Sequence, residues 1–194
     1  ERCLAARPGL MERCGLADVR VVVVSDGSTD RTLEIARSFE PRITVVEFVR
    51  NRGYGAAIKE GWRVGGGELL GFLDADGTCD PAYFAPMCEK AIAGTDVVLG
   101  NRLHADSKMP FIRRVGNRLF AALLGYISQK AVGDTASGMR VVRREALRLL
   151  YPLPDGLNFT PAISALCLVH EELSIAEIDM PYREREGRSK LHVL

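Results

Sequence analysis

The sequence predicts an α/β fold in which a mostly parallel sheet lies between two layers of helices. Three observations favour this fold class. Short apolar segments of strand length alternate with segments of helical periodicity through residues 19–100. The apolar segments are rich in valine, leucine and isoleucine, as expected of strands buried on both faces. Two of them run directly into turns that contain Asp and Gly, at Ser25–Gly27 and Asp74–Gly77.

The individual elements follow from local patterns. Strands are expected at 19–24, 43–48, 69–73, 96–99, 139–142 and 174–179. Helices are expected at 2–16, between Thr29 and Pro41, and at 53–62, 81–92, 113–129, 144–150 and 159–170. Pro8-Gly9 predicts an interruption of the first helix, and Ser28 or Thr29 is expected to cap the second.

The composition is that of one ordinary globular domain. The chain has 194 residues, 47% hydrophobic and 26% charged, so we expect a single domain over residues 1–194. The net charge of +1 gives no overall basic field, and we expect no nucleic-acid partner. The five cysteines are odd in number and never at C-x-x-C spacing, which indicates neither a disulfide framework nor a zinc motif and favours a reducing compartment.

Acidic residues follow two of the predicted strands. Asp26 follows the first strand, and Asp74 and Asp76 follow the third. Ligands of open α/β sheets gather at the carboxyl ends of the strands. Residues two apart at a strand end project to the same side, so Asp74 and Asp76 can present both carboxylates to one hard cation that bridges a substrate's phosphates. The alternative is a solvated Asp76-Gly77 turn, and this motif alone favours neither interpretation.

Other chemical motifs are missing. The sequence contains no G-x-x-x-x-G-K-[ST], and neither Gly53-x-Gly55 nor Gly65-x-Gly67 completes a G-x-G-x-x-G turn. Ser137-Gly138 lacks the preceding glycine of a nucleophile elbow, and the three histidines are isolated along the chain. A P-loop nucleotide site and a Ser-His hydrolase are therefore not indicated.

Six motifs in order resemble the family 2 glycosyltransferases of GT-A fold, and look most like the polyprenyl-phosphate branch that includes dolichol-phosphate mannosyltransferase. The motifs are Val24–Asp30, Arg50–Ile58, Leu73–Thr78, Leu99–Arg102, Gly133–Arg140 and Arg185–Leu191. Each is weak by itself, but six in family order over most of the chain are not expected by chance. The resemblance implies a three-layer, Rossmann-like nucleotide-diphospho-sugar transferase, with a nucleotide-sugar half at about 19–102 and an acceptor half at about 103–194.

The resemblance also implies roles for individual residues. It assigns donor binding to Ser25, Asp26, Gly53, Lys59 and Asp74. It assigns catalytic roles to Asp76, Arg102 and Asp134. It places Arg114, Ser137 and Lys190 at the acceptor or at phosphate groups. Asp74 and Asp76 form the family's D-x-D motif and would hold Mg²⁺ or Mn²⁺, with Asp76 as the direct ligand. A solvated basic face is an equally good interpretation of Arg114 by itself.

The implied chemistry is physically consistent. Departure of a nucleoside diphosphate builds negative charge on the pyrophosphate, which a cation and arginine side chains stabilise. An acceptor that is already an ionised phosphate attacks without a strong general base. We therefore expect an inverting transferase that moves a sugar from UDP- or GDP-sugar to a polyprenyl (dolichyl or undecaprenyl) phosphate. The alternatives are the same donor with a soluble acceptor, and a non-catalytic nucleotide-sugar binding module.

The sequence departs from the family pattern in several places. The family opens with a strand that ends in a Pro-x-x-Asn-Glu-like turn, and this sequence has none. Because that strand would lie inside the sheet, its neighbours would be left unpaired. We expect the chain to lack this strand and any C-terminal membrane segment. Ser25 stands where the family usually has an aspartate, and Thr78 stands where the mannosyltransferases often have a metal-binding glutamine.

The segment 113–129 combines basic and apolar residues. Arg113, Arg114 and Arg118 lie in its first turns, and apolar residues widen its hydrophobic side beyond one stripe. Such a helix can lie in a membrane interface with its arginines beside a lipid phosphate. The alternative is an ordinary core helix that packs on the sheet. With the family resemblance, we expect peripheral contact with the cytoplasmic face of a membrane.

Overall fold

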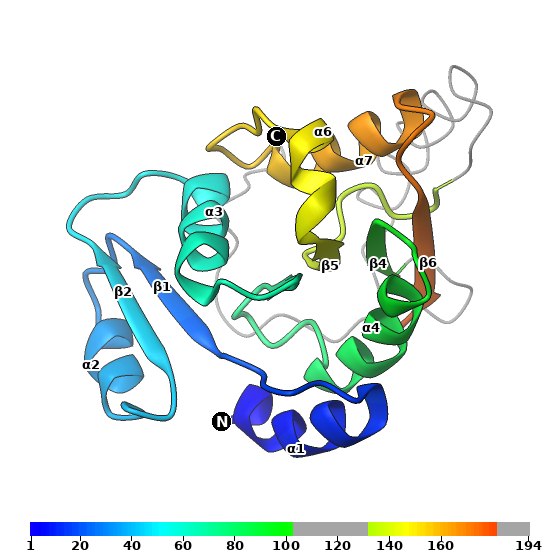
Figure 1. Cartoon of the computed structure of the whole chain (residues 1–194). Coiled ribbons are helices and arrows are strands. Elements are labelled where there is room, and N and C mark those ends of the chain that lie inside the picture. Colours follow the sequence, from blue (N-terminus) through cyan, green and yellow to red (C-terminus); the bar gives the residue numbers. More distant parts are fainter. Residues whose placement is uncertain (103–131, 182–194) are drawn as a thin grey trace.

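The computed structural model of the chain describes residues 1–102 and 132–181 (Figure 1). Its helices are α1 (Arg2–Cys14), α2 (Thr32–Arg37), α3 (Tyr54–Gly65), α4 (Phe84–Ile92), α6 (Leu147–Leu150) and α7 (Phe159–Val169), with 3₁₀ turns η1 (Pro81–Tyr83) and η2 (Arg144–Ala146). Its strands are β1 (Val22–Asp26), β2 (Thr44–Phe48), β3 (Leu69–Leu73), β4 (Val97–Asn101), β5 (Met139–Arg143) and β6 (Ile175–Asp179). The expected strands are present, and the expected helix at 113–129 lies outside the described residues.

The strands form two sheets. β1 pairs in parallel with β2, and a second sheet has the order β3-β5-β4-β6. In the second sheet β4 is parallel to β6, whereas β5 is antiparallel to both β3 and β4. The α/β fold class is confirmed, but the antiparallel strand was not predicted. Arg102 follows the carboxyl end of β4 and pairs with Asp134, which lies just before β5. The chain therefore re-enters the sheet at the same end at which it left β4. For this reason β5 must run antiparallel to β4.

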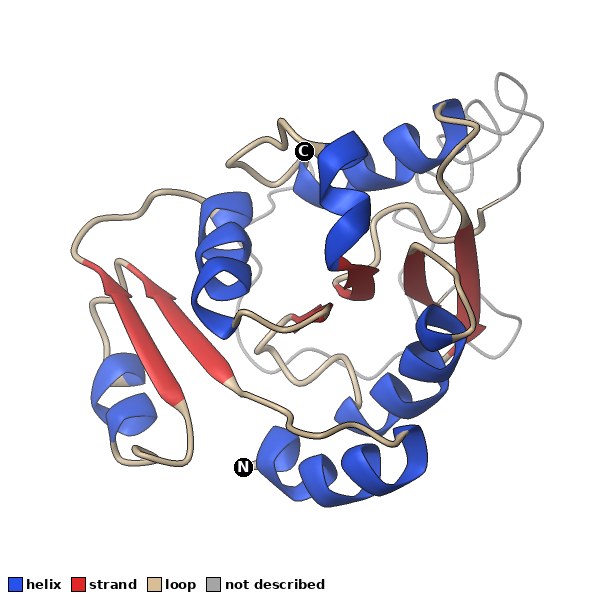
Figure 2. Cartoon of the chain, viewed as in Figure 1, coloured by secondary structure: helices blue, strands red, loops and turns tan. Residues whose placement is uncertain are grey.

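Helices cover both faces of the second sheet (Figure 2). On one face, α3, α6 and α7 enclose a core that includes Trp62, Leu150 and Phe159. The rings of Trp62 and Phe159 lie 5.6 Å apart between centroids. On the other face, α4 packs against the strands with Met87 and Cys88, and α1 packs against α4. The expected three-layer arrangement is therefore present.

Two local expectations about helices are corrected. α1 continues through Pro8 to Cys14, and the left-handed conformation of Gly15 (φ 63°) lets the next N–H, from Leu16, also donate to the carbonyl of Met11 at 3.0 Å. A proline removes one backbone N–H from the helical ladder, and this exposed helix retains the other bonds. Neither Ser28 nor Thr29 caps α2. Its first N–H, from Thr32, is accepted by the Asp30 carboxylate at 3.0 Å, because α2 begins later than expected.

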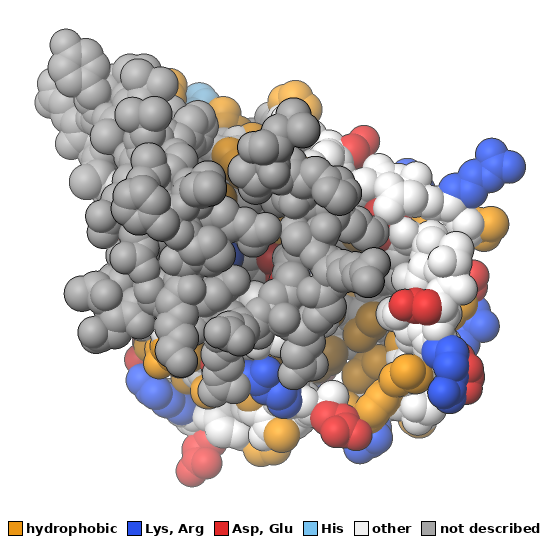
Figure 3. All heavy atoms as spheres, turned by 180° about the vertical axis from the view of Figure 1, so that it is seen from behind, with side chains coloured by type: hydrophobic (Ala, Val, Ile, Leu, Met, Phe, Trp, Pro, Cys, Tyr) orange, Lys and Arg blue, Asp and Glu red, His pale blue; other side chains and the backbone are white. Residues whose placement is uncertain are grey.

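A large cavity separates the two sheets. It has a volume of about 2020 Å³ and is lined by β1, β3 and side chains of α1, α3 and α4. Its polar end contains Asp26, Asp74 and Asp76, and the rest is mainly apolar. Seen from behind, a hollow with hydrophobic side chains opens at the surface on the side of β1 and β2 (Figure 3). A ligand pocket usually measures about 300–1,000 Å³, so the cavity is larger than a substrate alone requires.

The strands beside this cavity each have an unused edge in the described structure. β1 pairs with β2, and β3 pairs with β5, but β1 and β3 do not pair with each other. Gly71, in the middle of β3, is exposed, and the valines of β1 are only half-buried. The absence of a family strand stays a prediction, and these two edges are where such a strand would lie.

Candidate functional site

The carboxylate of Asp74 is held at the end of β3. Its backbone N–H donates to the carbonyl of Gly138 at 3.0 Å, and its Oδ1 accepts a hydrogen bond from the Tyr54 hydroxyl at 2.8 Å. A Cβ atom at position 138 would collide with Asp74 Oδ2, so glycine is required there while the carboxylate keeps this orientation. Burial raises the pKa of the Tyr54 phenol, and the charge of Asp74 raises it further. The hydroxyl therefore stays protonated and acts as the hydrogen-bond donor to Asp74. Asp74 therefore has a defined orientation at the polar end of the cavity.

Asp76 forms an Asp-Gly turn with Gly77, which is one of the two interpretations that the sequence allowed for this motif. Its Oδ1 accepts hydrogen bonds from the backbone N–H of Thr78 at 3.1 Å and from its hydroxyl at 2.7 Å. The turn and a metal-binding role are compatible, because a carboxylate has two oxygens and several lone pairs. Oxygen ligands of this kind suit Mg²⁺ and Mn²⁺. Within residues 1–102 and 132–181 no group of three or more His, Cys, Asp or Glu side chains is placed to hold a metal.

Asp26 and Ser25 lie at the end of β1. Both carboxylate oxygens of Asp26 accept backbone N–H groups, from Arg52 at 2.6 Å and from Gly53 at 3.0 Å. Ser25 is buried and donates to the Ser28 hydroxyl at 3.0 Å. Asp26 thus fixes the loop that precedes α3 while it also lines the cavity. Donor binding by Asp26 and Ser25 stays a prediction.

Gly53 and Lys59 contact the loop before α7. Gly53 has φ 108°, and a Cβ atom on it would lie 2.5 Å from the carbonyl oxygen of Asp155. The ammonium of Lys59 donates to the carbonyl of Leu153 at 2.7 Å and pairs with the Asp155 carboxylate at 2.8 Å. These contacts bind the two segments together. The nucleotide contact expected of both residues stays a prediction.

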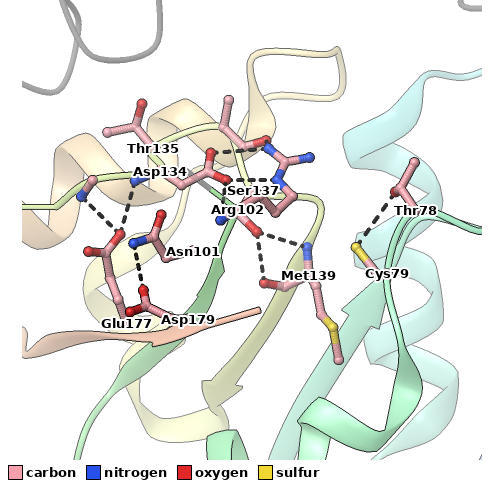
Figure 4. A network of polar contacts seen from close by, with 12 residues as sticks. Thr78, Cys79, Asn101, Arg102, Asp134, Thr135, Ser137, Met139, Glu177 and Asp179 are labelled. Carbon is pink, nitrogen blue, oxygen red and sulfur yellow. Dashed lines mark hydrogen bonds and ion pairs between the residues drawn. The ribbon is translucent and has the colours of Figure 1, made fainter. Parts of the chain in front are cut away.

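Arg102 and Asp134 form a buried ion pair (Figure 4). Two guanidinium nitrogens of Arg102 bond to the two oxygens of Asp134 at 2.7 and 3.1 Å, and the Arg102 backbone N–H adds a third bond at 3.2 Å. The side chains are 12% and 0% exposed, respectively. Burial opposes the charge of Arg102, but the neighbouring Asp134 carboxylate outweighs it and raises the pKa of the guanidinium, which stays protonated. The structure thus joins two of the predicted catalytic residues.

The loop at 133–138 is held from three further elements. Glu177 on β6 accepts the N–H groups of Gly133 and Asp134 at 2.9 and 3.0 Å. Arg140 on β5 donates to the carbonyls of Thr135 at 2.7 Å and Ser137 at 3.2 Å. The Ser164 hydroxyl of α7 also donates to Thr135. These bonds explain how a polar loop can lie inside the protein.

Ser137 has no exposed surface. Its hydroxyl donates to the Met139 carbonyl and accepts the Met139 N–H, both at 3.3 Å. In this arrangement Ser137 shapes the loop from inside and presents no atom to an acceptor. The expectation that Ser137 lines the acceptor side stays a prediction. The other two predicted acceptor or phosphate residues, Arg114 and Lys190, lie outside the described residues.

The sequence profile described as "Glycosyl transferase family 2" matches residues 9–150. The chain belongs to glycosyltransferase family 2. It is 36% identical over 174 residues to a dolichyl-phosphate hexose transferase of Haloferax volcanii, a match that covers 88% of this chain and 73% of the relative. It is 29% identical over 195 residues to an undecaprenyl-phosphate 4-deoxy-4-formamido-L-arabinose transferase of Photorhabdus laumondii, which covers 98% of this chain and 57% of the relative.

Solved structures support the GT-A fold of this family 2 glycosyltransferase. Glucosyl-3-phosphoglycerate synthase of Mycobacterium tuberculosis, in complex with Mn²⁺, UDP and phosphoglyceric acid, matches with a TM-score of 0.68 at 21% sequence identity. The match covers 96% of this chain and 65% of that one. In the part of this glycosyltransferase that the structure describes, no helix is both long and apolar enough to cross a bilayer.

Sequence reasoning missed three polar residues of this glycosyltransferase site, namely Tyr54, Arg140 and Glu177. Tyr54 and Arg140 lie within motifs that carried the family resemblance, but no role was assigned to them. Arg140 offered a signal, because a charge in the middle of an apolar strand needs internal partners. It is fully buried, and burial lowers the pKa of its guanidinium to about 10. Glu177 offered no signal, since alternating polar residues are ordinary in a strand.

The buried ion pair of this glycosyltransferase predicts a large loss of stability. Asp134→Asn should lower the free energy of unfolding by about 3 kcal/mol, because it leaves the buried charge of Arg102 without its counter-ion. Asp18→Asn is the matched control, since the Asp18 carboxylate also accepts a hydrogen bond from an arginine at 2.7 Å but is 46% exposed, and it should change the free energy of unfolding far less. Urea unfolding of both variants measures the difference. Equal effects would show that burial does not govern the Arg102–Asp134 pair.

Proposed function

We propose that this family 2 glycosyltransferase moves a sugar from a UDP- or GDP-sugar to a polyprenyl phosphate, with inversion at the sugar. The observation that carries this proposal is the 36% identity to a dolichyl-phosphate hexose transferase over 88% of the chain. The similarity to an undecaprenyl-phosphate transferase supports the same class of acceptor. The chain spans 73% and 57% of these two relatives, so the activity of the whole protein is part of the proposal.

The donor site is proposed at the polar end of the cavity. Asp74 and Asp76 would hold Mg²⁺ or Mn²⁺, and the bound cation would offset the charge that builds on the departing pyrophosphate. The Mn²⁺ and UDP bound by the Mycobacterium tuberculosis synthase support this choice of ligands. Asp26, together with the loop before α3 that its carboxylate holds, lines the polar end of the cavity opposite Asp74 and Asp76. The wide apolar part of the cavity is not required for the nucleotide.

Arg102 and Asp134 are proposed to act as a unit on the acceptor side. Both oxygens of Asp134 accept hydrogen bonds from Arg102, and Asp134 is fully buried. We infer that Asp134 positions Arg102 and does not take a proton from the acceptor. A polyprenyl phosphate is already ionised and needs no base, so this arrangement fits the proposed acceptor. Arg102, which interacts electrostatically with Asp74, would stabilise phosphate charge beside the donor.

Donor recognition can be tested by thermal shift. We expect UDP- or GDP-sugars with Mn²⁺ to raise the Tm, because a ligand at 100 times its Kd stabilises the folded state by about 2.7 kcal/mol. For a chain of this length that is a rise of about 5 °C or more. Omission of Mn²⁺ should remove most of the shift. A panel in which no nucleotide-sugar shifts the Tm, with or without metal, would contradict the donor site.

Membrane contact gives a second test, directed at the segment 113–129. We expect binding to anionic liposomes, stronger when they contain polyprenyl phosphate, and weaker after combined Arg113→Glu and Arg114→Glu. Co-sedimentation measures the binding. Donor-induced thermal shifts should survive in the double variant, since the proposed donor site lies around Asp26 and Asp74. Unchanged liposome binding in the double variant would remove the local support for a lipid acceptor.

A further inference from the structure

Tyr54 connects the start of α3 to the end of β3. It is the first residue of α3, and its hydroxyl donates to Asp74 Oδ1 at 2.8 Å. Its ring packs edge-on against Phe159, with centroids 6.4 Å apart and an interplanar angle of 82°. The ring is therefore part of the core, while the hydroxyl reaches the cavity end. The two parts of the side chain can be tested separately, because phenylalanine keeps the ring and removes only the hydroxyl.

The backbone around Tyr54 is fixed on both sides. Before it, the N–H of Gly53 is accepted by Asp26 at 3.0 Å. After it, the N–H groups of Gly55 and Ala56 both donate to the carbonyl of Asp155, at 2.7 and 3.1 Å. These bonds occupy amides that a helix start could otherwise offer to a phosphate. The first turn of α3 therefore serves as a fixed support for the Tyr54 hydroxyl.

Asp74 is restrained from the opposite side as well. Gly138 accepts the Asp74 N–H through its carbonyl, and the space for a Cβ at Gly138 is filled by Asp74 Oδ2. One carboxylate oxygen thus faces the Tyr54 hydroxyl, and the other lies against the backbone of the loop at 133–138. A carboxylate held at both oxygens keeps one orientation before any substrate arrives.

We infer that Tyr54 is a positioning residue, whose hydroxyl orients the Asp74 carboxylate for the cation that accompanies the donor. This inference rests on the proposed function. Groups that orient a metal ligand through a hydrogen bond typically change metal affinity by about 10–100-fold when they are removed. The expected cost of removing this hydroxyl therefore falls on metal binding, while the packing of the ring is unchanged.

The test measures Mn²⁺ binding without turnover. The free Mn²⁺ signal in electron paramagnetic resonance gives the Kd of Mn²⁺ for the chain in the presence of UDP or GDP. We expect Tyr54→Phe to raise this Kd about 10–100-fold, with little change in Tm because the ring remains in place. Tyr83→Phe is the matched control, since Tyr83 is half-buried against the other core cluster and lies outside the site. It should bind Mn²⁺ like the parent chain.

A second variant approaches Asp74 from the other side. Gly138→Ala should displace the carboxylate by steric collision and also weaken Mn²⁺ binding. Mn²⁺ binding by the parent chain and by Tyr54→Phe distinguishes failure of the metal site from failure of the role of Tyr54. If the parent chain binds no Mn²⁺ with either nucleotide, the proposed metal site fails and this inference fails with it. If the parent binds Mn²⁺ and Tyr54→Phe binds it equally well, the proposed function stands and the role of Tyr54 is wrong.

Discussion

Asp76→Asn is expected to reduce metal-dependent sugar transfer by at least about 10²–10³-fold, the range seen when one group that stabilises transition-state charge is removed. The fold should remain intact, because the amide oxygen of asparagine can still accept the hydrogen bonds from Thr78. The variant loses the negative charge that a hard cation requires. Initial rates over a range of Mn²⁺ concentrations, together with the Tm, measure both effects.

The control for this change is Asp80→Asn. Asp80 accepts the N–H of the residue two positions later, Ala82, at 3.1 Å, as Asp76 does with Thr78. It tests whether loss of a carboxylate in such a turn is harmful by itself. We expect transfer by Asp80→Asn to stay within about two-fold of the parent, well under the roughly 1.4 kcal/mol that a ten-fold change represents. Full activity of Asp76→Asn would show that Asp76 is not a metal ligand.

An extended apolar segment placed ahead of Glu1 is expected to raise both stability and transfer. The reason is the cavity of about 2020 Å³ between β1 and β3, each of which has one edge that no described strand pairs with. Arg2, at the start of α1, pairs with Asp80 at 3.6 Å, beyond the carboxyl end of β3. A strand that leads into α1 from this position would run parallel to β3. About 10–30 residues suffice for one strand of about six residues and its turn.

The expected gain is several kcal/mol. Each fully buried Val- or Leu-sized side chain contributes about 1.5–3 kcal/mol, against about 1–2 kcal/mol for ordering each backbone unit. We expect a net gain on the order of 3 kcal/mol, which raises the Tm of a chain of this size by about 6–12 °C. Thermal unfolding and hydrogen exchange at β1 measure it. The amides of β1 should become more protected.

The matched control is the same segment with Lys or Glu at alternate positions, which cannot be buried on both faces of the strand. It should give no gain in Tm. If the apolar and the charged segments have the same effect, the cavity does not accept a strand. The two edges of β1 and β3 would then be features of the fold with another explanation.

Much of the fold could be predicted from local pattern. The valine run at Val21–Val24 and the apolar run at Leu69–Leu73 identify strands, and the acidic residues after them mark the polar end of the cavity. The direction of β5 could not be predicted. Its sequence, Met139–Arg143, reads as any apolar strand, and its direction follows from the distant pair of Arg102 and Asp134.

The site residues show the same division. Asp74 and Asp76 were singled out because two carboxylates follow a strand at a spacing of two, although only the family resemblance favoured a metal site over a solvated turn. Tyr54 was missed because its role depends on an Asp74 contact across twenty positions of the chain. Gly53 and Lys59 contact the loop at 153–155, which the sequence did not predict, and their expected contact with a nucleotide stays a prediction. The contact between these two residues and the loop at 153–155 depends on tertiary packing, so no local pattern in the sequence predicts it.

Sugar transfer to a lipid phosphate can be measured by offering the chain a lipid acceptor and a soluble acceptor side by side. Purified chain is incubated with Mn²⁺, a labelled UDP- or GDP-sugar that raises its Tm, and either polyprenyl phosphate in detergent or 3-phosphoglycerate. We expect label to appear in the lipid fraction as a glycosyl polyprenyl phosphate of inverted configuration, and to be lost in Asp76→Asn. Transfer to 3-phosphoglycerate alone, or donor binding with transfer to neither acceptor, would contradict the proposed function.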